Sequence, residues 1–251
     1  MKKRMAIAAA LALAPNSALA QEDDHKWSAG AIGFVNPSPF VGEKTEIRVF
    51  PYVSYSGDRV YLRGLEAGYK AIKPQRGAPG AQVSFDMMVR ARPQPGSSRD
   101  GFSLDAGARF GVDTSIGTVA LTALQEVSGK HDGLELELGL SRRFSGADWA
   151  ITPSLSVAWQ SRGLANYLWG VSAADRLDMV VSGTNALLPA FELDGSVVNA
   201  NAGLVASYDL TARWSMVLLG RATWLGSNAR ENPWIDNRMD ASVGLAVAYA
   251  F

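Results

Sequence analysis

The chain has 251 residues, 47% of them hydrophobic, and its 24 basic and 24 acidic residues cancel to a formal net charge of zero. Because there is no surplus positive charge, the sequence lacks the electrostatic footprint of a nucleic-acid-binding protein. The absence of Cys excludes disulfides, thiolate metal sites and thiol nucleophiles.

The first twenty residues are typical of a cleaved secretory signal peptide. A basic n-region, an apolar segment and a small-x-small cleavage site follow one another: Lys2 to Arg4, Met5 to Ala14, and Ala18 to Ala20. A membrane anchor would need about 20 consecutive apolar residues, whereas Pro15 to Ser17 interrupt this run. We therefore expect residues 1–20 to be removed on export, and residues 21–251 to form one domain with a net charge of −3.

The remainder of the chain alternates apolar with small or polar residues, in segments of about ten residues. Between Phe102 and Asp113, for example, every charged residue has the same parity, so all the charges lie on one face of a strand. Strands of soluble sandwiches are typically about five or six residues long, whereas those of membrane barrels run to about ten. The sequence therefore predicts an all-β fold, a transmembrane antiparallel up-and-down β-barrel.

The alternation gives about twelve strands, an even number as expected for a bacterial barrel. In chain order the predicted strands are 26–35, 45–55, 59–70, 81–92, 101–112, 117–127, 133–143, 148–160, 165–171, 196–210, 212–225 and 238–251. The segment 165–171 has the weakest pattern. Ten strands remain an alternative, because a few connections, notably 145–148, break the usual asymmetry of short turns and long loops.

If both termini are periplasmic, the connections sort into short turns and longer external loops, as is usual for such barrels. The short periplasmic turns are 56–58 and 209–212, and the external loops are 71–80, 172–195 and 226–237. The short connection 145–148 would then be an exception on the external side.

Tryptophans indicate where the bilayer ends. Trp149 and Trp159 lie ten residues apart on one face of a predicted strand, and Trp214 and Trp224 repeat this spacing. Ten residues of a strand tilted by about 45° rise roughly 23 Å, close to the roughly 25 Å apolar band between aromatic girdles. The last strand ends at the aromatic Phe251, which resembles the assembly signal of outer-membrane proteins.

Charged residues of inward parity define the contents of the lumen. They are Glu46, Arg48, Asp86, Arg90, Asp105, Arg109, Glu135, Glu137 and Arg221. Because unpaired charges in a narrow lumen would be costly, we expect most of them to form mutually satisfied ion pairs. The same set could instead line a pore or bind a polar ligand.

Few residues could support catalysis. The mature chain has only His25, near its N-terminus, and His131, in a turn over 128–133 that the predicted topology places on the periplasmic side. A membrane lipase needs a His beside a Ser nucleophile, and a rim protease needs His and acidic residues at the external rim. We therefore expect no enzyme activity and predict no catalytic residue, cofactor or metal site.

Several segments resemble the MipA/OmpV family of outer-membrane proteins. They are Pro39-Phe40-Val41-Gly42, Pro51 to Tyr55, Ser56-Gly57-Asp58-Arg59-Val60-Tyr61-Leu62-Arg63-Gly64, Asn166-Tyr167-Leu168-Trp169-Gly170-Val171, Tyr208-Asp209-Leu210 with Trp214, Asn232-Pro233 and Tyr249-Ala250-Phe251. Asn232 departs from the Ser usual before that proline. Within the first block, Gly64 and Gly68 predict a bulge or close packing, and Arg59 and Arg63 are expected at the periplasmic rim.

The resemblance implies a non-enzymatic scaffold that brings a lytic transglycosylase and a penicillin-binding protein together during growth of the murein sacculus. Other members act as adhesins or porin-like antigens, which keeps a small channel or a surface-exposed adhesin open as alternatives, with a lipid-modifying enzyme ranked third. Expected partners also include outer-membrane lipid, lipopolysaccharide and the barrel-assembly machinery.

Overall fold

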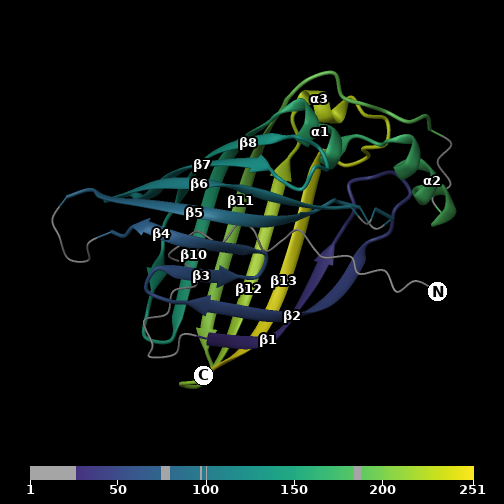
Figure 1. The fold of residues 1–251 in the computed structure, drawn as a ribbon. Coiled ribbons are helices and arrows are strands. Elements are labelled where there is room, and N and C mark those ends of the chain that lie inside the picture. Colours follow the sequence, from purple (N-terminus) through teal and green to yellow (C-terminus); the bar gives the residue numbers. More distant parts are fainter. Residues whose placement is uncertain (1–26, 75–79, 97, 100, 184–187) are drawn as a thin grey trace.

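A computed structural model describes residues 27–74, 80–96, 98–99, 101–183 and 188–251, which form a closed twelve-stranded antiparallel β-barrel (Figure 1). The strands are β1 (Trp27–Asn36), β2 (Glu46–Ser56), β3 (Val60–Arg63), β4 (Glu66–Ile72), β5 (Gln82–Pro93), β6 (Phe102–Thr114), β7 (Gly117–Glu126), β8 (Leu134–Ser141), β9 (Phe144–Ser145), β10 (Trp149–Gln160), β11 (Val197–Asp209), β12 (Trp214–Trp224) and β13 (Met239–Ala250). The two-residue β9 continues the ladder of β8 along β10 and does not add a strand to the circumference. The predicted fold is confirmed.

Neighbouring strands in sequence are neighbours in the barrel, and the wall closes where the chain ends meet. Ser28 of β1 lies opposite Ala250 of β13, and β10 pairs with β11 across the longest connection. That connection holds α1 (Arg162–Trp169) and α2 (Ala173–Val181), and the connection before β13 holds α3 (Ser227–Arg230). None of these helices has the length and apolar character needed to span a bilayer.

The barrel has two different ends. At the terminus end, where β1 begins and β13 finishes, strands are joined by short turns, with 73–81 as the longer exception. At the loop end lie the connections 37–45, 94–101, 127–133, 161–196 and 225–238, together with all three helices (Figure 1). This asymmetry is the one expected of an outer-membrane barrel.

The outer surface carries the predicted apolar band with aromatic residues at both rims. Trp149 and Trp214 lie at the terminus end and Trp159 and Trp224 at the loop end, all with 36–49% of their surface exposed. On the last strand, apolar side chains such as Val243, Leu245 and Val247 face outward, whereas Ala246 and Ala248 are buried. The residues given to each face by the alternation are confirmed.

The prediction of one strand over 59–70 is wrong, because these residues fold into two short strands. β3 and β4 make a tight hairpin in which Gly64 adopts φ +57°, a left-handed conformation that favours glycine. This turn explains the parity shift in the sequence that suggested a bulge. The pairing of β4 with β5 does have an irregular register, but it lies between Lys70 and Ile72. Close packing is confirmed at Gly68, where an added Cβ would lie 2.4 Å from the ring of Tyr61.

The predicted strand 165–171 is also wrong, since these residues belong mostly to α1. One extra strand and one missing strand leave the count at twelve, so the ten-strand alternative is wrong. Between the two errors, however, every strand runs in the opposite direction to the prediction.

This inversion moves the connections between these strands to the other end of the barrel, including three whose side was predicted from the sequence. The loop after β4 lies at the terminus end, where Lys73 pairs with Asp58. The connection 145–148 also lies at the terminus end and is no longer an exception, whereas 127–133 lies at the loop end beside α1. The regions 172–195 and 226–237 lie at the loop end, and 56–58 and 209–212 at the terminus end, as predicted.

Candidate functional site

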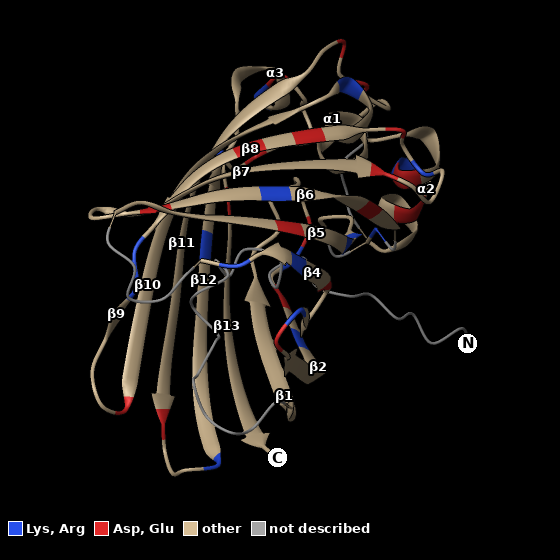
Figure 2. Ribbon diagram, turned by 60° about the vertical axis from the view of Figure 1, so that its left-hand side comes forward, with Lys and Arg blue, Asp and Glu red and all other residues tan. Residues whose placement is uncertain are grey.

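Charged side chains fill one side of the lumen between β4 and β8. Acidic and basic positions adjoin one another on β5, β6 and β8 (Figure 2). Strand alternation explains their inward direction, since residues two apart share a face. The antiparallel register then brings opposite charges together, as where Arg90 lies opposite Asp105 and Glu66.

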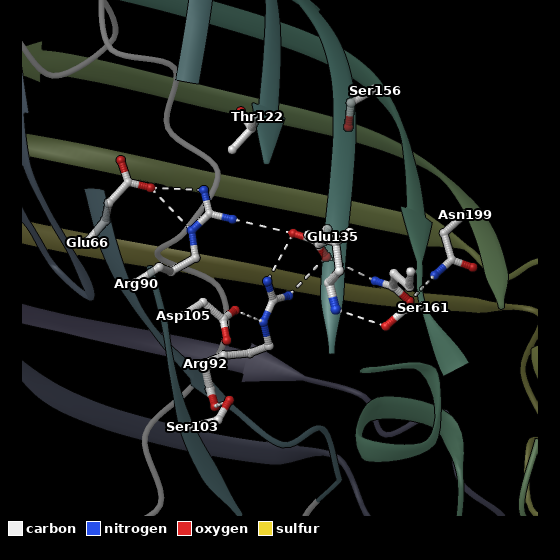
Figure 3. A network of polar contacts seen from close by, with 12 residues as sticks. Glu66, Arg90, Arg92, Ser103, Asp105, Thr122, Glu135, Ser156, Ser161 and Asn199 are labelled. Atoms are coloured by element: carbon white, nitrogen blue, oxygen red, sulfur yellow. Dashed lines mark hydrogen bonds and ion pairs between the residues drawn. The ribbon is translucent and has the colours of Figure 1, made fainter. Parts of the chain in front are cut away.

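We define the lumen network as Glu66, Arg90, Arg92, Asp105 and Glu135 (Figure 3). Nη2 of Arg90 lies 2.9 Å from Oε2 of Glu66, and Nε of Arg92 lies 2.6 Å from Oδ2 of Asp105. Glu135 joins the two halves, because its Oε1 lies 3.0 Å from Nη2 of Arg92 and 3.7 Å from Nη1 of Arg90. All five side chains are buried or nearly so, and burying them is tolerable only because each charge has an opposite charge in contact.

Further polar residues extend the lumen network toward the loop end. Gln160 of β10 donates to Glu135 at 3.2 Å, and the side-chain oxygen Oε1 of Gln160 accepts from the indole N–H of Trp169 at 2.9 Å. The same oxygen accepts from Asn199 at 3.0 Å. Because Trp169 ends α1, these bonds tie the helix at the barrel mouth to the charges inside.

All nine charged residues predicted to face inward have the inward parity. Asp86, Arg90, Asp105 and Glu135 are buried, and the other five are partly buried. The prediction of internal ion pairs is confirmed for the members of the network and for Arg109, whose Nη2 lies 3.3 Å from Oε2 of Glu66.

Two members of the network were not predicted. Glu66 was not predicted to face inward, because the prediction of one continuous strand over 59–70 assigns the residues after the turn to the wrong faces. Arg92 shares the parity of Arg90 and could have been found from the alternation alone.

Segments distant in sequence cover the mouth at the loop end, and we call this assembly the cap. Its core contains Phe40, Val171, Met179 and Trp234, each no more than 2% exposed. Asn232 stands where the family usually has Ser, and its side-chain amide donates to the carbonyl of Trp169 at 2.6 Å. The predicted family segments around residues 40, 170 and 232 thus meet in one structure.

Arg99 fastens the cap to the end of α1. Its guanidinium donates to the carbonyls of Leu168 at 3.0 Å and Tyr167 at 2.8 Å, and it lies 4.8 Å from the ring centre of Phe40. Burial lowers the pKa of Arg99 from its ordinary value, although the nearby Asp175 opposes this shift. The cap is therefore a bonded structure and not a loose set of loops.

His131 lies at the loop end, which corrects its predicted position at the periplasmic side. Its Nε2 is 3.2 Å from Oγ of Ser103 and 3.9 Å from Asp105, and its ring stacks on Tyr167 at 4.5 Å. These neighbours have the residue types of a catalytic triad, so the direction of each hydrogen bond decides whether they could act as one.

The hydrogen bonds of His131 are those of a structural residue. The N–H of Gly133 donates to Nδ1 at 3.1 Å, so the neutral ring carries its proton on Nε2 and donates it to Ser103. A general base would need an unprotonated nitrogen facing the hydroxyl. Burial also lowers the pKa of His131, which keeps the ring neutral. The other histidine, His25, lies outside the described residues.

Comparison with known proteins identifies the family of the chain. Residues 29–251 match the family described as MltA-interacting protein MipA. The MltA-interacting protein of Escherichia coli (strain K12) is 23% identical over 265 residues that cover 100% of both chains. A putative outer membrane protein of the same organism, YiaT, is 25% identical over 59% of this chain and 63% of its own length.

Among solved structures, an outer membrane channel from Pseudomonas putida F1 covers 95% of this chain and 100% of its own, with 9% identity and a TM-score of 0.40. The chain is an outer-membrane protein, as its barrel and its relatives agree. Because the family match spans most of the sequence, the chain belongs to the MltA-interacting protein MipA family.

Proposed function

We propose that this protein is a non-enzymatic outer-membrane scaffold that holds a lytic transglycosylase, together with a penicillin-binding protein, close to the membrane. The observation that carries this proposal is the full-length similarity to a protein named for its interaction with MltA. The lumen network gives further support, because each of its charges contacts an opposite charge instead of facing a substrate. The donor role of His131 is likewise consistent with a protein that performs no catalysis.

The surface that suits such partners is the terminus end. Its mostly short turns match the periplasmic side of an outer-membrane barrel, where enzymes of the cell wall reside. Hydrogen bonds to β4 hold the turn after β2 in place. Lys70 donates to the carbonyl of Gly57 at 2.9 Å, and Arg59 donates to the carbonyl of Ala71 at 3.1 Å. A turn that is already held in this way loses little conformational entropy when a partner binds.

Site-specific photo-crosslinking in intact envelopes tests the scaffold. A photoreactive amino acid replaces Ile116, in the turn between β6 and β7 at the terminus end, and in a matched control it replaces Leu177 of α2 at the loop end. Both side chains are 62% exposed, so they differ in location and not in accessibility.

We expect position 116 to capture a murein hydrolase or synthase that position 177 does not. If both positions capture only assembly machinery and lipopolysaccharide, the scaffold proposal fails, and a channel or surface-exposed role becomes the better explanation.

A further inference from the structure

In the part of the chain that the structure describes, the hydrogen-bonded ladder of the closed barrel is interrupted beside β2. Among the described residues, Glu46 to Val53 pair with β1 alone, whereas Ser54 to Ser56 pair with β3. The β3–β4 hairpin turns back at Gly64, well short of the loop end (Figure 1). The half of β2 nearer the cap therefore has a neighbouring strand on one edge only.

Described residues border this gap on its other sides. Below it is the hairpin turn, where the carbonyl of Leu65 accepts from the N–H of Ala91 on β5 at 2.8 Å. Above it, the loops 37–45 and 94–101 meet, since Glu43 accepts from the N–H of Ser98 at 3.1 Å. The unpaired edge of β2 thus lies between the hairpin turn and these loops, whereas β5 is paired with β4 as far as Arg90. We call this interruption of the hydrogen-bonded wall the lateral window.

The sequence of β2 suits a free edge. The N–H of Gly57 donates to Val60 of the β3 side, so the backbone groups of odd-numbered β2 residues point toward the lateral window and not toward β1. Pro51 is one of these residues, and because it has no N–H it presents no donor there. Proline is confined to edges within sheets, and it opposes addition of another strand at this position.

The lateral window lies at the depth of the bilayer. Tyr55 packs against Trp27 at the aromatic rim of the terminus end, with ring centres 4.6 Å apart. From Tyr55 to Ile47 a tilted strand rises roughly 19 Å, which remains inside the roughly 25 Å apolar band. Ile47 and Val49 on this stretch are 74% and 72% exposed, so the lipid-facing surface continues to the border of the window.

A cluster of buried apolar side chains faces the interior of the barrel from β1, β2, β11, β12 and β13. Ile32 and Phe34 of β1 and Tyr52 of β2 form a cluster with Val205, Val217, Leu219, Ala246 and Ala248, and Phe50 packs against it. Barrel lumens are ordinarily polar, as this one is on the side of the lumen network. We call these residues the apolar lumen patch.

We propose that the lateral window admits the acyl chain of an outer-membrane lipid from the bilayer to the apolar lumen patch. Lipid is the occupant because the exposed surface of Ile47 and Val49 is continuous with the bilayer-facing band, and because Phe50 and Tyr52 continue it inward on the same strand. Pro51 disfavours a further strand in the window. This inference does not depend on the scaffold function.

Quenching by brominated lipid tests the window directly. The chain has no Cys, so Phe50→Cys gives a single site for a bimane fluorophore in the whole protein. Two other variants act as references, Leu155→Cys on the outer face of β10 and Leu124→Cys on the inner face of β7, where the wall is paired on both sides. The labelled proteins are placed in vesicles of phosphatidylcholine with and without bromine on the acyl chains.

We expect the fraction of fluorescence quenched at position 50 to be at least threefold that at position 124 and to approach that at position 155. A difference below threefold between positions 50 and 124 overturns the proposal, because a sealed or fully packed wall keeps bromine equally far from both. If Phe50→Cys does not fold, Arg48→Cys provides a second inward site on the same strand, and the same threshold applies.

Discussion

Replacing Arg92 with Met removes the cation that joins Asp105 to Glu135 in the lumen network. The side chains of Arg92, Asp105 and Glu135 are 12%, 2% and 6% exposed, so water cannot replace the lost contacts fully. Breaking a buried ion pair costs about 3–5 kcal/mol. Glu135 keeps Gln160 at 3.2 Å, which places the expected loss of unfolding free energy near the lower limit, about 3 kcal/mol.

The assay is urea unfolding of the barrel in lipid vesicles, followed by Trp fluorescence. Arg142→Met is the matched control, since Arg142 is exposed and lies over the Phe144 ring at 5.2 Å, and its loss should change stability by no more than about 0.5 kcal/mol. Adding Asp105→Asn to the Arg92→Met variant removes the negative charge that has lost its partner. The double variant should regain about 1–2 kcal/mol of unfolding free energy. An Arg92→Met variant as stable as Arg142→Met would refute the view that the lumen network holds the barrel together.

Two further substitutions and one titration probe the hairpin, the cap and the turn that holds His131. Gly68→Ala should lose about 1–3 kcal/mol in the same assay, because the new Cβ would lie 2.4 Å from the Tyr61 ring, and unchanged stability would contradict this packing. Trp234→Ala should lose about 3–5 kcal/mol in thermal unfolding, since its side chain is fully buried in the cap. NMR titration should show His131 protonating below its ordinary pKa of about 6.5. Because the unfolded chain binds this proton first as pH falls, acid should destabilise the turn, and an unshifted midpoint would contradict its burial.

The faces of the strands could be predicted from the sequence because alternation is a local property. The outward tryptophans, the terminal strand and the inward charges all follow from the period of two. Which charges meet inside the lumen could not be predicted, since the contact between Arg92 and Glu135 depends on the register of strands far apart in the sequence.

Two local structures do not follow the alternation, and they account for the two errors in the predicted strands. In the β3–β4 hairpin, a two-residue turn with Gly64 in a left-handed conformation looks in sequence like a parity shift within one strand. In α1, the aromatic residues Tyr167 and Trp169 suggest a strand, whereas the helix is held by contacts made only in the folded barrel. Tyr167 stacks on His131, and Trp169 donates to Gln160. The two errors cancelled in the strand count but inverted the direction of every strand between them.

The structure shows that three of the segments that resemble the family meet in the cap. Phe40 and Val171 belong to two segments that carried the resemblance, and Trp234 directly follows a third, Asn232-Pro233. These three residues pack together in one buried cluster at the loop end. Asn232 is 1% exposed and bonded to Trp169, so the departure from Ser at this position bears on the packing of the cap and not on a partner surface. These three segments therefore specify how the mouth is closed. The turn at Gly57 and Asp58, Tyr208-Asp209-Leu210 with Trp214, and the closing Tyr249-Ala250-Phe251 lie at the terminus end, where the proposed partners would bind.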